Sequence, residues 1–338
     1  MGGSRFPNMV PDLDKRDFLK KAAAACSGLL IPGKAFAAKP SLNLGYLPIT
    51  DATPLLVAHS LGYFSQEGLK VDRPVMVRSW KILTESFLAG KFDLTHMLFP
   101  IPVWMRFKQG FPVKVLAWDH TNGSAVTVRG DSSIRGFADL GGRQVAVPSW
   151  YSMHNLLLQM GLRANGLSPV IKPQSASLRP DQVNLFILPP PDMPTALLGK
   201  KIDAFIVADP FNALAQIKFK ARIMRYTGDI WKNHPCCVIV AGQSLIQKKP
   251  AIVQKAVNAI VRAQAWCKNN PRETAHLLSR DGEGYLPLPE KVLAKVFQKP
   301  EHHELVHPGW QPARIGFQPY PFPSAPRFII NQMKAAKV

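Results

Sequence analysis

An acidic residue at the end of an apolar strand is the first feature that points to a binding site. In the stretch LPPPDMPTALLGKKIDAFIVADPF, residues 188–211, the apolar run Ala204–Ala208 predicts a strand buried on both faces. Asp209 follows that strand directly, and open α/β sheets bind ligands beyond the carboxyl ends of their strands. Pro189–Pro191 predict a rigid turn before a short helix over Met193–Lys200. We therefore expect a βαβ unit whose strand end and helix start face a ligand.

The cysteines are the second group of residues that could carry chemistry, as metal ligands or in disulfides. Cys236 and Cys237 are adjacent, and Cys267 stands alone, while Cys26 lies near the start of the chain. No C-x-x-C motif and no Cys/His spacing typical of zinc is present, so the sequence predicts no metal site. Two interpretations of the other three cysteines stay open: buried free thiols, or a disulfide between Cys267 and one member of the pair.

Catalytic patterns are missing from the sequence. We find no nucleophile with a base, no paired carboxylates and no metal cluster at a recognisable spacing. The sequence therefore favours a binding protein that is not an enzyme and uses no cofactor.

Alternating strand and helix patterns fill the 338-residue chain and predict an α/β fold with about two lobes. Strands are expected at 42–47 and 69–77, with a helix at 54–64 between them, and a helix and a strand share 79–98. GKFDL at 90–94 and GKKIDAF at 199–205 stand at equivalent places, where a helix leads into a strand. This repetition predicts two similar lobes built on parallel sheets.

The N-terminus has the features of an export signal over residues 1–37. Lys15 and Arg16 precede the apolar run Ala22–Ile31, and Ala35-Phe36-Ala37 forms an A-x-A cleavage site. KRDFLK resembles the twin-arginine export motif with Lys15 in place of one arginine. Lipid attachment at Cys26 is the weaker alternative. We expect a periplasmic protein.

The charge of the chain is strongly basic. Cleavage after Ala37 removes six of 42 basic and three of 22 acidic residues, which leaves a net charge of +17. The basic clusters GKK and QKK lie in expected turns, without the interleaved aromatic residues that nucleic-acid binding requires. A basic solvated surface, which also attracts anions, is favoured over a nucleic-acid partner.

Seven motifs follow one another along the chain: LPITDATPLLVAHSLGYFSQEGL, SWKILTESFLAGKFDLTHML, HTNGSAV, FILPPPDMPTALLGKKIDAF, TGDIWKNHP, AQAWC and YPFPSAPRFIINQM. In this order they resemble the periplasmic solute-binding proteins of ABC importers, in the nitrate/sulfonate/bicarbonate-binding family. The similarity runs from about Leu42 to Met333 and is nearest to the nitrate and bicarbonate branch.

The resemblance implies a two-lobed periplasmic-binding-protein fold, type II-like, with the ligand in a cleft between the lobes. Because the chain of that family crosses between lobes twice, residues 38–128 and 240–338 are expected to form lobe one. Residues 129–239 are then expected to form lobe two.

The resemblance also implies a set of ligand-binding residues. Trp80 corresponds to a site tryptophan whose indole N–H donates to an oxyanion, and His154 to a ligand-binding histidine. Asn122 and Ser124 stand where the family often has glutamines, and Asp209 opens a counterpart of its Glu-Pro-Trp pattern. The full candidate set is Thr50, Asp51, Trp80, Asn122, Ser124, His154, Pro191, Asp209 and Lys218. Two structural alternatives stay open: Thr50-Asp51 caps the first helix, and Trp80 packs in the core.

These observations predict a monomeric, exported protein that captures a small anion, such as nitrate, nitrite, bicarbonate or a sulfonate, for an ABC permease. A cytoplasmic ligand sensor of the same family is the alternative. A pyrimidine-forming enzyme on the same fold is disfavoured, because its cysteine-rich motif is absent.

Overall fold

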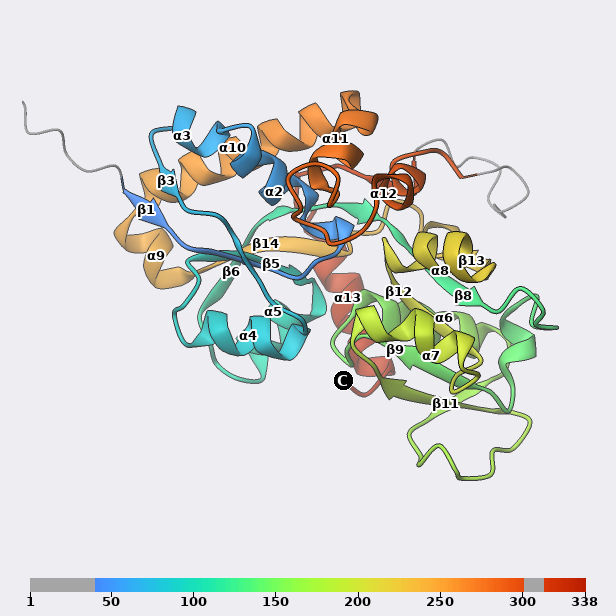
Figure 1. Cartoon of the computed structure of the whole chain (residues 1–338). Coiled ribbons are helices and arrows are strands. Elements are labelled where there is room, and N and C mark those ends of the chain that lie inside the picture. The colour runs from blue at the N-terminus through green and yellow to red at the C-terminus, as the bar shows by residue number, and fades with distance from the viewer. Residues whose placement is uncertain (1–39, 301–312) are drawn as a thin grey trace, which may run out of the picture. The chain divides into compact units, whose positions relative to one another are not determined.

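Two mixed β-sheets, each flanked by helices, make up the computed structural model, which describes residues 40–300 and 313–338 (Figure 1). The predicted signal segment and Cys26 lie outside the described residues. No helix in the described ranges combines the length and the hydropathy needed to cross a membrane.

The first sheet has the strand order β4-β2-β5-β14-β6. Its strands are β4 (Val75–Met76), β2 (Leu44–Tyr46), β5 (Leu94–Leu98), β14 (Cys237–Gly242) and β6 (Val113–Trp118). The short strands β1 (Ser41–Leu42) and β3 (Lys70–Val71) pair with each other beside it. Its helices are α2 (Thr53–Ser60), α3 (Tyr63–Gln66), α4 (Trp80–Leu88), α5 (Pro100–Phe107), α9 (Gln243–Lys248), α10 (Pro250–Asn269), α11 (Pro271–Leu278) and α12 (Glu290–Val296), with the 3-10 turn η1 (Thr50–Ala52).

The second sheet has the strand order β10-β11-β9-β12-β8-β13. Its strands are β10 (Ser168–Val170), β11 (Gln182–Ile187), β9 (Gln144–Val147), β12 (Ala204–Ala208), β8 (Ser124–Val128) and β13 (Arg222–Tyr226). The helical segments are η2 (Phe137–Leu140), α6 (Met153–Ala164), η3 (Pro190–Asp192), α7 (Met193–Leu198), α8 (Phe211–Phe219) and η4 (Thr227–Asp229). Two further strands, β7 (Thr121–Asn122) and β15 (Ile315–Gly316), pair with each other, and α13 (Ser324–Ala335) contacts α5 and α6.

Both sheets differ from the parallel sheets expected from the sequence. The strands that follow a crossing between sheets, β8 and β14, run antiparallel to their neighbours. Because β8 belongs to the second sheet and β14 to the first, the chain passes between sheets within residues 119–123 and 227–236. Both crossings therefore lie a few residues before the lobe boundaries expected at 128 and 239.

Two predicted elements of the first sheet are divided in the structure. The strand expected at 69–77 becomes β3 and β4, because Pro74 has no N–H to donate and Arg73 leaves the sheet to bond the Glu283 carbonyl at 2.6 Å. The helix expected at 54–64 ends at Ser60, because Gly62 adopts the left-handed conformation with φ of 67°.

The internal repetition is confirmed at the level of hydrogen bonds. In the first sheet, the Asp93 carboxylate accepts from the Asn43 N–H at 2.8 Å, while the Asp93 N–H donates to the Asn43 carbonyl at 2.8 Å. In the second sheet, Asp203 makes the same two bonds with Gln144, each of 2.9 Å. Each aspartate thus ties the entry of one strand to the start of a neighbour.

A glycine inside α6 sets how closely this helix lies to η2. A Cβ atom added at Gly161 would collide with the ring of Phe137. Since α6 also carries His154, this packing determines where the start of the helix lies.

Substitution of Gly161 by alanine is expected to destabilise the protein by up to about 2 kcal/mol. Overpacking against the Phe137 ring costs ~1–3 kcal/mol, and the ~1 kcal/mol that alanine gains over glycine in a helix offsets part of that cost. Urea unfolding of Gly161→Ala checks this, and the added substitution Phe137→Leu should relieve the clash in a double-mutant cycle. A Gly161→Ala protein more stable than the parent would contradict the packing argument.

A buried histidine joins β5 to the end of β2. His96 Nε2 accepts a hydrogen bond from the Leu47 N–H at 3.0 Å, and its ring meets the Trp80 indole edge-on at 5.4 Å. Burial lowers the pKa of His96 from 6.5 to about 3, so the ring is neutral and keeps the lone pair that Leu47 requires.

We expect acid to weaken the fold through His96. As pH falls from 6.5 toward 3, His96 binds a proton in the unfolded chain but stays neutral in the folded protein. The free energy of unfolding therefore decreases. The slope contributed is at most about 1.4 kcal/mol per pH unit. Urea titrations at about pH 7 and about pH 4.5 should show a smaller loss for His96→Gln, whose amide oxygen still accepts from Leu47. An unchanged loss would remove His96 as the cause.

Candidate functional site

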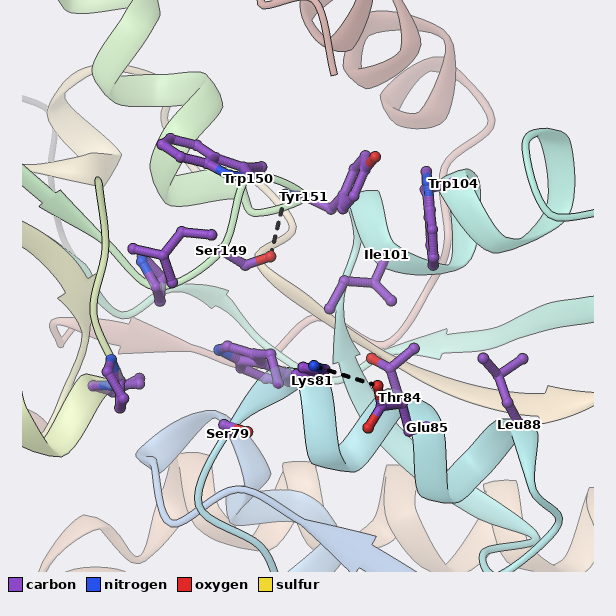
Figure 2. Close-up of a pocket in the computed structure, with 15 residues that line it drawn as sticks. Ser79, Lys81, Thr84, Glu85, Leu88, Ile101, Trp104, Ser149, Trp150 and Tyr151 are labelled. Carbon is purple, nitrogen blue, oxygen red and sulfur yellow. Dashed lines mark hydrogen bonds and ion pairs between the residues drawn. The ribbon is translucent and has the colours of Figure 1, made fainter. Parts of the chain in front are cut away.

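A cleft of about 490 Å³ lies between segments of the two sheets (Figure 2). From the first sheet it takes the start of α4 and the residues Ile101 and Trp104 of α5. From the second sheet it takes the loop 148–151 before α6, and Ile187, Pro189 and Pro190 after β11. The cleft expected between two lobes is thus present, and the proline turn forms part of its wall.

Serine caps place two helix starts at this cleft. Ser79 accepts from the Ile82 N–H at 3.2 Å and begins α4, so Trp80 and Lys81 occupy its first turn. Ser152 accepts from the Asn155 N–H at 3.0 Å and begins α6, which leaves Tyr151 just before it. Because the N–H groups of a first helical turn have no partner within the helix, both starts favour negative charge.

Aromatic rings from the two sheets meet across the cleft. Trp104 of α5 stacks on Tyr151 with centroids 4.8 Å apart, and Trp80 and Trp150 also line the space. The other lining groups are mostly apolar, apart from the hydroxyls of Ser79, Thr84 and Ser149 and the pair Lys81–Glu85, 3.9 Å apart. This arrangement can hold a small molecule with an apolar body and one polar or charged end.

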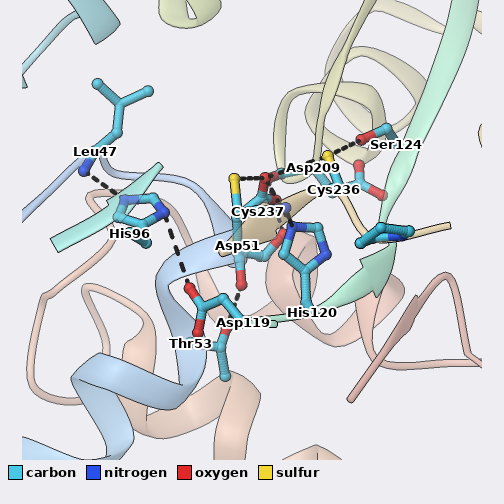
Figure 3. Close-up of polar contacts among 12 residues, drawn as sticks. Leu47, Asp51, Thr53, His96, Asp119, His120, Ser124, Asp209, Cys236 and Cys237 are labelled. Atoms are coloured by element: carbon cyan, nitrogen blue, oxygen red, sulfur yellow. Dashed lines mark hydrogen bonds and ion pairs between the residues drawn. The ribbon is translucent and has the colours of Figure 1, made fainter. Parts of the chain in front are cut away.

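A second group of polar residues is fully buried where the chain crosses between the sheets (Figure 3). Asp51 of η1 has Oδ2 3.0 Å from His120 Nε2 and 3.1 Å from Cys237 Sγ. Cys236 Sγ lies 3.9 Å from the same carboxylate oxygen. One donor atom from each of these four residues, here named the Asp–His–Cys–Cys cluster, lies within 4.8 Å of the others.

Burial and the contacts among these residues shift their pKa values. Burial raises the pKa of Asp51. Burial alone would lower the pKa of His120, but the adjacent Asp51 carboxylate raises it well above its usual value. Burial opposes ionisation of Cys236, yet contacts with Cys237, His154 and His120 bring the pKa of its thiol well below the usual range. The site therefore favours a thiolate at Cys236, whereas burial and the contacts with Cys236 and Asp51 raise the pKa of the Cys237 thiol well above its usual range.

Most of the predicted ligand residues surround this buried cluster instead of the cleft. His154 Nε2 is 2.8 Å from Ser124 Oγ and 4.0 Å from Cys236 Sγ. Thr50 donates from its N–H and its hydroxyl to the carbonyl oxygen of Asp209, at 2.9 and 2.8 Å. Thr50 and Asp51 make no side-chain cap on α2, so the capping alternative is wrong.

The remaining predicted residues have separate locations. Trp80 lines the cleft and is almost fully buried. Pro191 is exposed next to the cleft, which Pro189 and Pro190 line instead. Asn122 is buried in β7 and donates to Asn233 at 3.4 Å, outside both sites. Lys218 is exposed on α8, with its amine 5.5 Å from the Phe219 ring centroid.

Sequence reasoning missed His120, Cys236 and Cys237 as neighbours of Asp51. One signal was available, because Asp119-His120 directly follows the largely apolar segment 113–118, which forms β6, as Asp209 follows its strand. It also missed Trp104, Trp150 and Tyr151. All three described cysteines are free and buried, so the disulfide alternative is not what the structure shows.

Known proteins similar to this chain agree with the fold and the resemblance. The nitrate/nitrite binding protein NrtA of Nostoc sp. is 29% identical over 248 residues, which cover 67% of this chain and 53% of that protein. The chain thus spans about half the length of that relative.

Two solved structures share the fold. The periplasmic nitrate-binding protein NrtA from Synechocystis gives a TM-score of 0.70 at 19% identity, covering 87% of this chain and 80% of that one. The alkanesulfonate-binding protein SsuA from Xanthomonas axonopodis, bound to MOPS, gives 0.67 at 18% identity, covering 89% and 95%. The two-lobed periplasmic-binding-protein fold predicted from the sequence is therefore confirmed. The model of the NMT1-like family matches residues 36–279, most of the sequence, and the chain belongs to that family.

Proposed function

We propose that this chain is an exported solute-binding protein of an ABC importer, which captures a small anionic solute in the cleft and delivers it to a membrane permease. The resemblance to nitrate- and sulfonate-binding proteins supports the role. A monomer in the periplasm that catalyses no reaction is part of the same proposal.

The observation that carries the proposal is the composition of the cleft. Its walls come from elements of both sheets, and Trp104 and Tyr151 make contact across it. A solute held there would touch both sides and favour their approach, which is how two-lobed binding proteins close around a ligand. The two helix starts supply N–H groups for an anionic end.

Among the anions predicted from the sequence, the lining favours an organic sulfonate over nitrate or bicarbonate. Nitrate and bicarbonate need hydrogen-bond donors on every side, whereas most of this cleft is indole, phenol ring, proline and aliphatic surface. An apolar group on the ligand gains about 25 cal/mol for each Å² of surface removed from water. The sulfonate group would lie at the α4 and α6 starts, with its organic part between the rings.

Thermal shift measurements across a ligand series test both the solute-binding role and the preference for organic sulfonates. We expect the melting temperature to rise from methanesulfonate through butanesulfonate to benzenesulfonate, with nitrate and bicarbonate at or below the first. A ligand present at about 100 times its dissociation constant stabilises the folded state by roughly 2.7 kcal/mol. Trp104→Ala should lower the response to the aromatic member most, while Trp266→Ala on α10, which lies outside the cleft lining, should leave it unchanged.

The outcomes distinguish failure of the organic preference from failure of the solute-binding role. A response to nitrate that exceeds the response to every sulfonate would overturn the organic preference and keep the solute-binding role. No response to any anion would overturn the role itself.

Closure of the cleft should be visible in tryptophan fluorescence. Trp80 lies between the cleft and His96, so its environment changes when a ligand excludes water from the cleft. Addition of the sulfonate that gives the largest thermal shift should alter emission in the parent and in Trp266→Phe, and the change should shrink in Trp80→Phe. A full signal in Trp80→Phe would show that Trp80 does not report on the cleft.

A further inference from the structure

Three distant segments of the chain deliver four metal-binding side chains to one buried point. Asp51 comes from η1 after β2, His120 from the crossing after β6, and Cys236 and Cys237 from the end of the second crossing. All four are fully buried, and Figure 3 shows their polar atoms turned toward one another.

The spacing of these atoms suits a tetrahedral cation. Metal–ligand bonds of about 2.0–2.3 Å in a tetrahedral zinc site place neighbouring ligand atoms roughly 3.3–3.8 Å apart. From Asp51 Oδ2, the distances are 3.0 Å to His120 Nε2, 3.1 Å to Cys237 Sγ and 3.9 Å to Cys236 Sγ. The remaining pairs of ligand atoms lie within 4.8 Å of one another, so shifts of up to about 1 Å would complete the tetrahedron.

Hydrogen bonding alone does not satisfy the cluster. His120 Nε2 lies 3.2 Å from the Cys237 N–H, which can only donate, and 3.0 Å from an Asp51 oxygen, which accepts when ionised. One ring nitrogen cannot accept from the first group and donate to the second. A cation gives the imidazole lone pair, the carboxylate and both sulfurs a common partner.

The start of β14 explains how two adjacent cysteines reach the same point. Neighbouring residues of a regular strand point to opposite faces of the sheet. Here β14 begins at Cys237, and Cys236 precedes it in the crossing, where its N–H bonds the His120 carbonyl at 3.3 Å. Both thiols can therefore face Asp51.

We propose that the Asp–His–Cys–Cys cluster binds one zinc ion. Two thiolates and an imidazole are ligands that zinc prefers, and a carboxylate completes a four-coordinate set. Because all four ligands come from the protein and are enclosed, the ion is structural. It joins η1 to both segments that cross between the sheets.

Cobalt substitution provides a direct test in the full-length parent protein. The protein is unfolded with a chelator and a reductant, refolded without metal and titrated with Co²⁺, and a second sample receives Co²⁺ during refolding because the cluster is buried. We expect thiolate-to-cobalt charge-transfer absorption that saturates at one equivalent and disappears when zinc is added. Zinc should also raise the melting temperature of the metal-free protein.

Variants assign the sulfur ligands. Cys236→Ser/Cys237→Ser should lose the charge-transfer band, whereas Cys267→Ser, which removes another buried free thiol, should keep it. Cobalt held by imidazoles or carboxylates alone gives no thiolate band, so binding elsewhere is distinguishable. The proposal is overturned if the parent shows no such band under either protocol, or if the double variant keeps it. If the double variant does not fold, the parent titration decides.

Discussion

Thr50 donates two hydrogen bonds to a single carbonyl oxygen, that of Asp209, and this contact joins the ends of β2 and β12. The two sheets share no ladder, so their relation depends on such contacts and on the crossing segments. The Asp209 carboxylate in turn accepts from the Ala213 N–H at 3.0 Å and faces Arg314 at 3.7 Å. A buried carboxylate is costly without such partners, so this junction holds its position only when η1, α8 and the segment after 313 are all in place.

The junction also explains why one end of each sheet supplies both an apolar cleft and a polar interior. Strand ends carry backbone and side-chain polar groups that cannot all reach water, because the crossings cover them. His96 separates the two environments: its ring packs on Trp80, which lines the cleft, and its Nδ1 lies 4.0 Å from Asp119 of the crossing. A solute bound as proposed would therefore contact an aromatic wall, and the polar groups behind that wall hold the crossings together.

Local sequence patterns predicted those elements that local physics determines. The strand Ala204–Ala208, the helix after the triple proline and the equivalence of Asp93 with Asp203 all depend on short-range signals, and all are present. The direction of β8 and β14 depends on where the chain crosses, which no local pattern records. The Asp–His–Cys–Cys cluster joins residues up to 186 positions apart. Spacing rules for zinc examine neighbouring ligands, so they pass over Asp51, His120 and the cysteine pair. Lys218, which the resemblance to the family named as a ligand residue, is exposed on α8 and lines neither the cleft nor the cluster.

The internal repetition distinguishes residues that hold the fold, which occur in both halves, from residues that line the cleft, which do not. Asp93 and Asp203 perform the same structural task in the two sheets, and so do the caps Ser79 and Ser152 at the two helix starts. The groups that would touch a solute do not repeat: Trp80 and Trp104 come from one side, and Tyr151 and the proline turn from the other. Under the proposed function, these few aromatic positions would decide the chemical class of the solute, on a frame to which both halves of the chain contribute equivalent contacts.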